Sequence, residues 1–332
     1  MKRVIAFVTG GYSGEAEVSY KSAITMEAEI DRDLFDVYRI DITPGEWFYK
    51  TPVGEKVIVD KNDFSLLVAG KKILFEAVLI GIHGTPGEDG KLQGYFDLMN
   101  LPYTTCDAAT SALTFNKRYT VAVAAFAGIQ VSHSVHLFKQ DNPDADEIGK
   151  RIKLPVFVKP NNGGSSIGMS KVNKMEDLSA AIQKAFLEDD QVLVEEFISG
   201  REFTVGVFRS GKEIIILPIT EVKTKKDFFD FEAKYSPGFT DEITPAVLDK
   251  KIETKIKEAA KKIYQVFNCG GVVRIDMIYN EAREAPFMLE INTVPGQTAA
   301  SVVPQQVRAM GWTLKQFYSA LIEDAISRTK KS

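Results

Sequence analysis

Two segments near the carboxyl end of this 332-residue chain alternate polar and apolar residues, and they restrict the fold more than any other feature. They run from Arg274 to Asn280 and from Phe287 to Asn292, with a short polar stretch between them. Alternation with period two predicts a strand, and two such strands around a short polar segment predict an antiparallel hairpin.

The spacing also predicts which residues of the hairpin face each other. With the turn centred near Arg283, Asp276 lies opposite Glu290 and Arg274 lies opposite Asn292, because facing residues in an antiparallel ladder have a constant index sum. These four residues share one face. The opposite, apolar face takes Val273, Ile275, Met277, Leu289 and Ile291.

The polar face of the hairpin has two interpretations. Two carboxylates and one amide oxygen are hard ligands that suit Mg²⁺, and an arginine beside them suggests phosphate chemistry. The alternative is a surface ion pair across the strands, which contributes little. A cluster of acids beside one cation favours the metal interpretation, because the acids repel each other unless a divalent ion neutralises them.

Composition is that of an ordinary globular protein. Hydrophobic residues make up 45% and charged residues 26% of the chain, whose length suits two or three domains. A net charge of −4 gives no reason to expect nucleic-acid binding. Cys106 and Cys269 lack metal-ligand spacing, and no apolar run reaches the roughly 20 residues that span a bilayer. We therefore expect a cytoplasmic protein without membrane contact.

The first third of the chain predicts a parallel sheet flanked by helices. Strand-like segments at 3–8, 36–41 and 77–82 alternate with a helix-like segment at 16–30. Ligands of such sheets bind at the carboxyl ends of the strands. The segments 10–15 and 81–90, both rich in glycine, follow two of these strands.

The remainder mixes strands and helices. We expect helices at 111–127, 174–187, 245–267 and 313–326, and a surface connection with a helix at 139–153. We expect strands at 156–159, 168–172, 191–197, 202–209 and 213–219.

The segment 221–244 is too long for a passive connection in a compact domain, and loops of this length are commonly functional lids. Its aromatic residues argue against disorder, and its lysines could face a polyanion. The aromatic residues are Phe228, Phe229, Phe231 and Tyr235, and the lysines are Lys223, Lys225, Lys226 and Lys234.

Two further segments suggest a nucleotide site. Lys159 ends a strand and precedes a loop of small residues at 163–168, whose backbone N–H groups could approach phosphate oxygens; a plain glycine turn is the alternative. Glu195 ends an apolar strand, where it could accept from an exocyclic amine or simply face solvent. No P-loop spacing and no G-x-G-x-x-G spacing occur, so the site would be of another kind.

In the order in which its motifs occur, the chain resembles the D-alanine–D-alanine ligases of the ATP-grasp group over nearly its full length. The matching motifs are Gly10 to Ser19, His83 to Gly90, Gly163 to Ser170, Glu232 to Tyr235, Gly271 to Asp276 and Leu289 to Gly296. The resemblance implies an α/β and α+β architecture of three domains. These are an N-terminal Rossmann-like domain at 1–105, a central ATP-grasp subdomain at 106–198 and a C-terminal ATP-grasp subdomain at 199–332.

The resemblance also implies roles for individual residues. ATP would be held by Lys117, Lys159, Ser165, Ser166, Glu195, Phe197, Ile198, Glu202 and Lys234. Two Mg²⁺ ions, or Mn²⁺, would be held by Asp276, Glu290 and Asn292. Catalysis would use Glu15, Ser165, Tyr235, Arg274 and Gly296, and the substrates would contact Glu15, His83, Arg274, Gly296 and Ser301. Of these, Ser301 is supported only by its spacing after Gly296.

The implied activity is ATP-dependent joining of two D-alanines through an acyl phosphate, for peptidoglycan precursor synthesis, by a homodimer. Tyr235 in the lid favours an amide product over the ester with D-lactate. The alternatives are another ATP-grasp carboxylate–amine ligase and a non-catalytic nucleotide-binding protein. A nicotinamide oxidoreductase is disfavoured by the missing glycine spacing.

Overall fold

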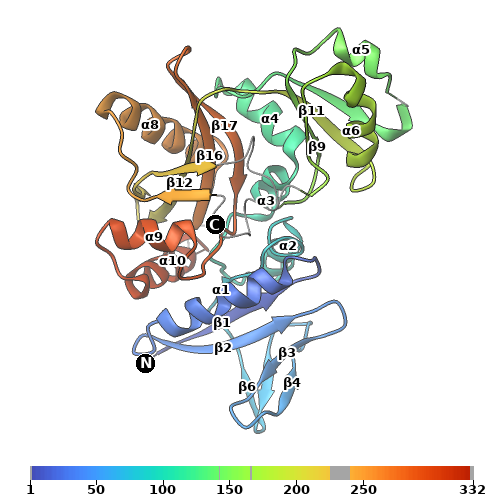
Figure 1. The fold of residues 1–332 in the computed structure, drawn as a ribbon. Helices are drawn as coiled ribbons and strands as arrows, with labels where there is room; N and C mark the ends of the chain where they lie inside the picture. The colour runs from blue at the N-terminus through green and yellow to red at the C-terminus, as the bar shows by residue number, and fades with distance from the viewer. Residues whose placement is uncertain (1, 142, 165–166, 225–239, 330–332) are drawn as a thin grey trace.

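A computed structural model describes residues 2–141, 143–164, 167–224 and 240–329. Within these ranges the strands form three sheets of five, four and six strands and one two-stranded ribbon. In Figure 1 the N-terminal sheet lies at the bottom, the central sheet at the upper right and the C-terminal sheet at the upper left. Each helix in the described ranges is too short or too polar to span a bilayer.

The N-terminal sheet has the order β4-β3-β2-β1-β7. Strands β2 (Phe35–Ile42), β1 (Arg3–Gly10) and β7 (Ala77–Ile80) are parallel, which confirms the predicted parallel sheet. The antiparallel strands β3 (Trp47–Lys50) and β4 (Lys56–Ile58), which extend the sheet beyond β2, were not expected from the sequence. Nor was the separate ribbon of β5 (Leu66–Val68) and β6 (Lys71–Ile73).

Helices cover this sheet and lead away from it. Helix α1 (Ala16–Glu29) packs on β1, as expected, and α2 (Lys91–Leu98) follows the second glycine-rich segment. The single helix predicted at 111–127 is in fact two helices, α3 (Ala108–Phe115) and α4 (Lys117–Phe126). Asn116 divides them because its backbone is extended, at φ −93° and ψ 104°, and its side chain accepts a hydrogen bond from the Tyr119 N–H in the first turn of α4.

The central sheet is antiparallel and has the order β10-β9-β11-β8. Its strands are β8 (Ser134–Phe138), β9 (Val156–Pro160), β10 (Ser170–Val172) and β11 (Gln191–Glu196), of which β8 was not predicted. The short helix α5 (Ala145–Gly149) lies in the predicted connection, after a 3₁₀ turn, Lys139–Asp141. A second 3₁₀ turn, Met175–Asp177, leads into helix α6 (Leu178–Ala185). One sheet face is covered by α6 and α5 through a core of buried valines, which leaves the opposite face to carry Lys159 and Glu195.

The C-terminal sheet has the order β15-β14-β12-β16-β17, with β13 also paired to β12. Its strands are β12 (Arg201–Ser210), β13 (Glu213–Ile216), β14 (Thr220–Thr224), β15 (Thr240–Ile243), β16 (Val272–Asn280) and β17 (Ala285–Asn292). The segment expected to be irregular from 221 to 244 therefore begins and ends as paired strands. Residues 225–239, with Lys225, Lys226, Phe228, Phe229, Phe231, Lys234 and Tyr235, lie outside the described ranges.

Three helices follow β15 or the hairpin. Helix α8 (Lys250–Val266) packs on the C-terminal sheet, starting five residues later than predicted because the Asp249 side chain caps it. Helix α9 (Val302–Ala309) was not predicted, whereas α10 (Leu314–Thr329) was. Helix α10 lies against α1, β7 and β12, so that Ile5, Phe208 and Phe317 belong to one buried core (Figure 1).

Candidate active site

The β16–β17 hairpin has the register predicted from the sequence. Arg274 pairs with Asn292 and Asp276 pairs with Glu290. The register shifts after Asp276, so that Met277 faces Met288. The alternation assigned Leu289 to the apolar face, but this bulge makes Leu289 the extra residue, and it is half-buried whereas Met288 is buried.

The polar face of the hairpin is organised around the carboxylate of Asp276. Arg274 donates from Nε to Oδ1 at 2.9 Å and from a terminal nitrogen to Oδ2 at 2.7 Å. Thr204 of β12 donates to Oδ1 at 2.5 Å, and the Asn292 amide donates to Oδ2 at 3.1 Å. Burial lowers the pKa of Arg274, but Asp276 outweighs this effect and raises the pKa above its usual value, so the guanidinium stays charged.

Glu290 completes this face as a more exposed carboxylate. Its side chain is 36% exposed and lies 3.9 Å from the Arg274 guanidinium. The described residues contain no cluster of three or more cysteine, histidine or acidic side chains that could hold a metal. Two carboxylates with one amide oxygen are instead an all-oxygen donor set, which fits Mg²⁺ rather than a softer transition metal.

Glu15 brings the N-terminal sheet and the glycine-serine loop together. It precedes α1 at the carboxyl end of β1. A Cβ atom placed on Gly164 would lie 2.9 Å from Glu15 Oε1, and one placed on Gly84 would lie 2.5 Å from Oε2. A side chain at either position would displace the carboxylate from where it stands, and the carboxylate therefore lies between these two loops. Ser165 and Ser166, next in the loop, are outside the described residues.

His83 links the N-terminal sheet to the loop that follows the hairpin. Its ring is buried; Nε2 lies 3.0 Å from Ser22 Oγ and Nδ1 lies 2.8 Å from the Val294 carbonyl oxygen. Burial lowers the pKa of His83 to about 4, so the ring is neutral at pH 7. Both ring nitrogens contact protein groups, so His83 holds the loop at Val294 through its ring.

Gly296 and Ser301 are neighbours across the start of α9. A Cβ atom on Gly296 would lie 2.9 Å from Ser301 Oγ. That hydroxyl also accepts from the Thr298 N–H at 3.0 Å and lies 2.8 Å from Thr298 Oγ1. The structure therefore places these two predicted residues together, at the N-terminus of a helix where an anion is favoured.

Lys159 and Glu195 form an ion pair on the open face of the central sheet. Their atoms lie 2.6 Å apart, and the side chains are 14% and 10% exposed. Lys117, the first residue of α4, donates to the Gly163 carbonyl oxygen at 2.6 Å and so reaches the glycine-serine loop. The predicted nucleotide residues of the central sheet thus lie on one side of it.

The strand end after Glu195 and the neighbouring β12 carry the other predicted ATP contacts. The Phe197 ring packs 6.0 Å from that of Phe157 and under the ammonium of Lys171 at 4.8 Å. Its N–H donates to the Pro155 carbonyl oxygen, so a contact from the Phe197 backbone would come from its carbonyl. Ile198 follows directly, and Glu202 lies near the start of β12.

Comparison with known proteins decides the family. A family model for the N-terminus of D-ala D-ala ligase matches residues 4–106, and one for its C-terminus matches residues 117–323. The chain belongs to the D-alanine–D-alanine ligase family. It is 44% identical to the D-alanine–D-alanine ligase of Parabacteroides distasonis, covering 99% of both chains, and 43% identical to that of Flavobacterium johnsoniae, covering 96% of this chain and 98% of the other.

Solved structures of the family share the fold. The VanG D-Ala:D-Ser ligase from Enterococcus faecalis superposes with a TM-score of 0.87 at 33% identity, covering 97% of this chain and 99% of the other. The D-alanine–D-alanine ligase from Bacillus anthracis complexed with ATP superposes with a TM-score of 0.78 at 26% identity, covering 99% of both chains. These likenesses confirm the expected multi-domain ATP-grasp architecture.

Sequence reasoning missed two residues of this family member's site. Glu88 accepts from the Gly84 N–H at 2.7 Å and from the Val294 N–H at 3.1 Å. Burial and the nearby negative charge of Glu15 raise the pKa of Glu88 to about 7. Ser22, on α1, contacts both His83 and the Gln297 N–H. Glu88 stands inside the motif from His83 to Gly90, but no local pattern shows that its partner is 206 positions away.

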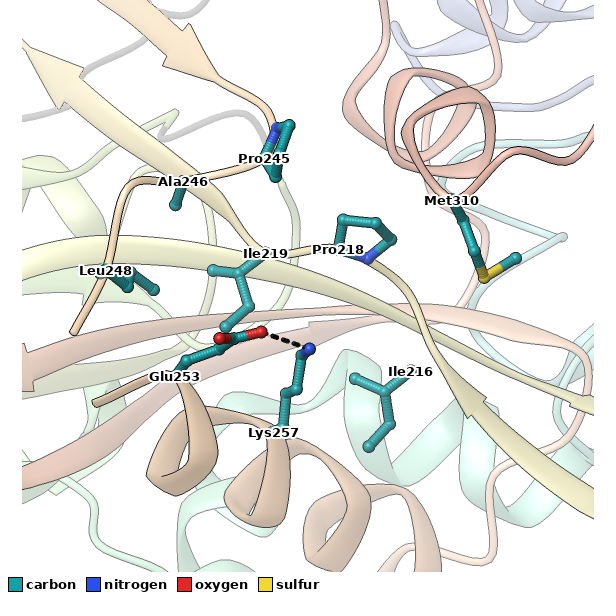
Figure 2. Close-up of a pocket in the computed structure, with 9 residues that line it drawn as sticks. All are labelled: Ile216, Pro218, Ile219, Pro245, Ala246, Leu248, Glu253, Lys257 and Met310. Carbon is teal, nitrogen blue, oxygen red and sulfur yellow. Dashed lines mark hydrogen bonds and ion pairs between the residues drawn. The ribbon is translucent and has the colours of Figure 1, made fainter. Parts of the chain in front are cut away.

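A surface pocket of about 290 Å³ lies away from this site. Figure 2 shows it above α8, between Pro218 and Pro245 on one side and Met310 on the other, with Lys257 bonded to Glu253 at its floor. None of the predicted site residues lines it. Predicted site residues meet instead at the junction of the sheets, where Glu15 lies beside Gly164 and His83 contacts Val294.

Proposed function

We propose that the chain joins two D-alanine molecules into D-alanyl-D-alanine at the expense of one ATP, for the synthesis of peptidoglycan precursors. The observation that carries this proposal is the hairpin face of Arg274, Asp276, Glu290 and Asn292, with its two carboxylates across one ladder rung. Such a set neutralises a polyphosphate through divalent ions while one guanidinium stays charged beside it.

The reaction divides into two steps. A carboxylate oxygen of the first D-alanine attacks the γ-phosphorus of ATP, so that ADP leaves and an acyl phosphate forms. The second D-alanine loses a proton from its ammonium group, and the free amine attacks the acyl carbon. The tetrahedral intermediate then expels inorganic phosphate and leaves the amide. Positioning and charge neutralisation dominate the first step, and exclusion of water protects its product.

The nucleotide would lie against the open face of the central sheet. Lys117 and Lys159 would contact its phosphates, and Glu195, with the backbone of Phe197 and Ile198, would contact adenine. Glu202 would contact the ribose. The proposed phosphate contacts of Ser165, Ser166 and Lys234 fall outside the described residues. Support comes from the reach of Lys117 to Gly163 and from the buried pairing of Lys159 with Glu195.

Asp276, Glu290 and Asn292 would hold two Mg²⁺ ions, which supply charge neutralisation of the triphosphate when bound. Asp276 also fixes the guanidinium of Arg274 by two hydrogen bonds. This directs the remaining Arg274 donors, which would stabilise charge on the acyl oxygen together with the Gly296 N–H.

The two amino acids would lie on either side of this centre. Glu15 would pair with the ammonium of the first D-alanine, in a network with Ser165 and Tyr235 that closes the lid. Ser301, at the N-terminus of α9, would receive the carboxylate of the second D-alanine. His83 would act on the substrates indirectly, through Val294.

We further propose three domains, at 1–105, 106–198 and 199–332, a cytoplasmic homodimer, and no nucleic-acid partner. The three sheets fall within these residue ranges one by one, which supports the division.

The test is to measure ADP release by the purified chain with Mg²⁺-ATP, with and without D-alanine, and to identify the product by mass. We expect ADP release that depends on D-alanine, with one dipeptide formed per ADP. The assay also tests other acceptor substrates, because one structural relative at 33% identity is a D-Ala:D-Ser ligase. D-serine and D-lactate are therefore offered in competition at neutral pH. ADP release without D-alanine, or a dominant ester product, would contradict the proposal.

A further inference from the structure

The loop that carries Gly296 is held from both ends by side chains that sequence reasoning did not connect with it. At Val294, the N–H donates to Glu88 Oε1 at 3.1 Å and the carbonyl oxygen lies 2.8 Å from His83 Nδ1. Glu88 also accepts from Gly84, in the loop beside Glu15. The peptide groups on both sides of the Val294 Cα are thus held by side chains from the segment that follows β7.

The hydrogen-bond directions around His83 follow from its partners. The Gln297 N–H donates to Ser22 Oγ at 3.2 Å, so the Ser22 hydroxyl is free to donate its own proton to His83 Nε2. The neutral ring then carries its proton on Nδ1 and donates it to the Val294 carbonyl. Ser22 and His83 therefore link Gln297 to Val294 around Gly296.

A second contact sets the peptide plane that contains the Gly296 N–H. Gln297 Nε2 donates to the Pro295 carbonyl oxygen at 3.2 Å, and Tyr318 of α10 donates to Gln297 Oε1 at 3.1 Å. The Pro295 carbonyl and the Gly296 N–H belong to one planar peptide group, so fixing the first fixes the direction of the second. The ring of Pro295 also fixes the φ angle of Pro295, a backbone dihedral that precedes this peptide group.

We propose that Glu88 and the Tyr318–Gln297 pair are positioning residues for the ligation step, acting by aiming the Gly296 N–H at the acyl oxygen. This inference rests on the proposed function. The aim matters because a donor stabilises the tetrahedral intermediate only when it points at the position where the oxyanion forms. Phosphoryl transfer to the first D-alanine does not use that donor. We call the contacts of Glu88 with Val294, and of Tyr318 through Gln297 with Pro295, the clamp. Disturbing the clamp therefore slows the ligation step and leaves the rate of phosphoryl transfer unchanged.

The two arms of the clamp can be disturbed separately, each with a matched control. Glu88→Gln replaces one acceptor oxygen by an NH₂ group, which cannot accept from a backbone N–H. Its control is Glu76→Gln, because Glu76 also accepts a backbone N–H, from Val4, but outside the site. Tyr318→Phe removes the hydroxyl that orients Gln297. Its control is Tyr264→Phe, because Tyr264 is equally buried and donates to the Gly271 carbonyl.

The measured quantity is the ratio of ADP to dipeptide, together with kcat and KM for ATP and D-alanine. Wild type and both controls are expected to give one ADP per dipeptide. In Glu88→Gln and Tyr318→Phe we expect the ligation step to slow about tenfold, a fraction of the loss on deleting an oxyanion donor. Hydrolysis then competes with ligation for the acyl phosphate, so the ratio rises clearly above one, with KM for ATP unchanged.

This ratio distinguishes positioning from a general loss of structure, because a smaller folded fraction lowers ADP and dipeptide equally. Ratios of one in both Glu88→Gln and Tyr318→Phe would overturn the inference, whatever the fall in kcat. A rise in the controls as large as in the clamp variants would overturn it as well. Absence of dipeptide from wild type would instead overturn the proposed function.

Discussion

Asp276 and Glu290 face each other on the hairpin and are proposed to hold the same ions. Replacing each of them should nevertheless lower the free energy of unfolding by different amounts. We compare Asp276→Asn with Glu290→Gln, each of which replaces a carboxylate by its amide. Asp276 accepts two hydrogen bonds from Arg274 and one from Thr204, and its side chain is 12% exposed. Glu290 lies 3.9 Å from Arg274 and is 36% exposed.

The magnitudes follow from these environments. Breaking a buried ion pair by removing one partner costs about 3–5 kcal/mol, because a charge is left uncompensated. The Arg274 side chain is 24% exposed, so water compensates part of this. We therefore expect Asp276→Asn to destabilise the fold by about 2 kcal/mol, below that range because of this exposure. Glu290→Gln should cost under about 1 kcal/mol, as for exposed pairs.

The assay is thermal unfolding of both variants without Mg²⁺, followed by ADP release as Mg²⁺ is titrated. Asp276→Asn should unfold several degrees below wild type, while Glu290→Gln unfolds close to it. Both should need more Mg²⁺ and release ADP slower by orders of magnitude. Equal destabilisation by the two variants would refute the reasoning on Arg274, and an unchanged Mg²⁺ requirement in Glu290→Gln would remove Glu290 from the metal site.

Three further outcomes test the remaining site. Glu15→Gln should raise the KM for the first D-alanine about 30-fold and leave the KM for ATP unchanged, because a charge-assisted hydrogen bond of about 2 kcal/mol is lost. An unchanged KM for D-alanine would mean that the ammonium group of the first D-alanine binds elsewhere. Gly164→Ala should lower activity with little change in melting temperature, because its methyl group displaces Glu15, whereas Gly14→Ala adds the same group in open space; equal activities would contradict the Glu15 geometry. His83, with its pKa lowered to about 4 from an unfolded value of 6.5, contributes stability that is complete above pH 6.5 and lost as the pH falls toward 4. Urea unfolding should therefore show about 2 kcal/mol less stability at pH 5 than at pH 7 from this group, and His83→Gln should lose less than wild type over that range.

The register of the hairpin could be derived from the sequence because it depends only on alternation and on the position of one turn. Arg274, Asp276, Glu290 and Asn292 accordingly lie where the pattern placed them. The bulge at Leu289 was not predicted. One extra residue leaves the alternation of polar and apolar side chains intact on each side of the bulge and reverses the two faces only from one side of the bulge to the other.

Other differences arise from tertiary contacts and side-chain capping. Asn116 divides a segment whose apolar spacing continues through it, because its side-chain oxygen accepts a hydrogen bond from the Tyr119 N–H in the first turn of the next helix. The bonds from Glu88 and His83 to Val294 span more than 200 positions, and nothing local to either residue indicates them. The short strands at the edge of the N-terminal sheet have too few residues to show a period.

The core shared by β1, α1 and α10 has a consequence for how the chain acquires its structure during synthesis. Ile5 and Phe7 from the first strand are packed with Phe317 and Ile326 from the last helix. While the nascent chain is still attached to the ribosome, that side of the early sheet has no permanent cover, and exposed apolar surface of this kind favours aggregation. This side of the sheet can complete its packing only after α10 has been synthesised, so removing the last turns of α10 should first expose the core residues of β1.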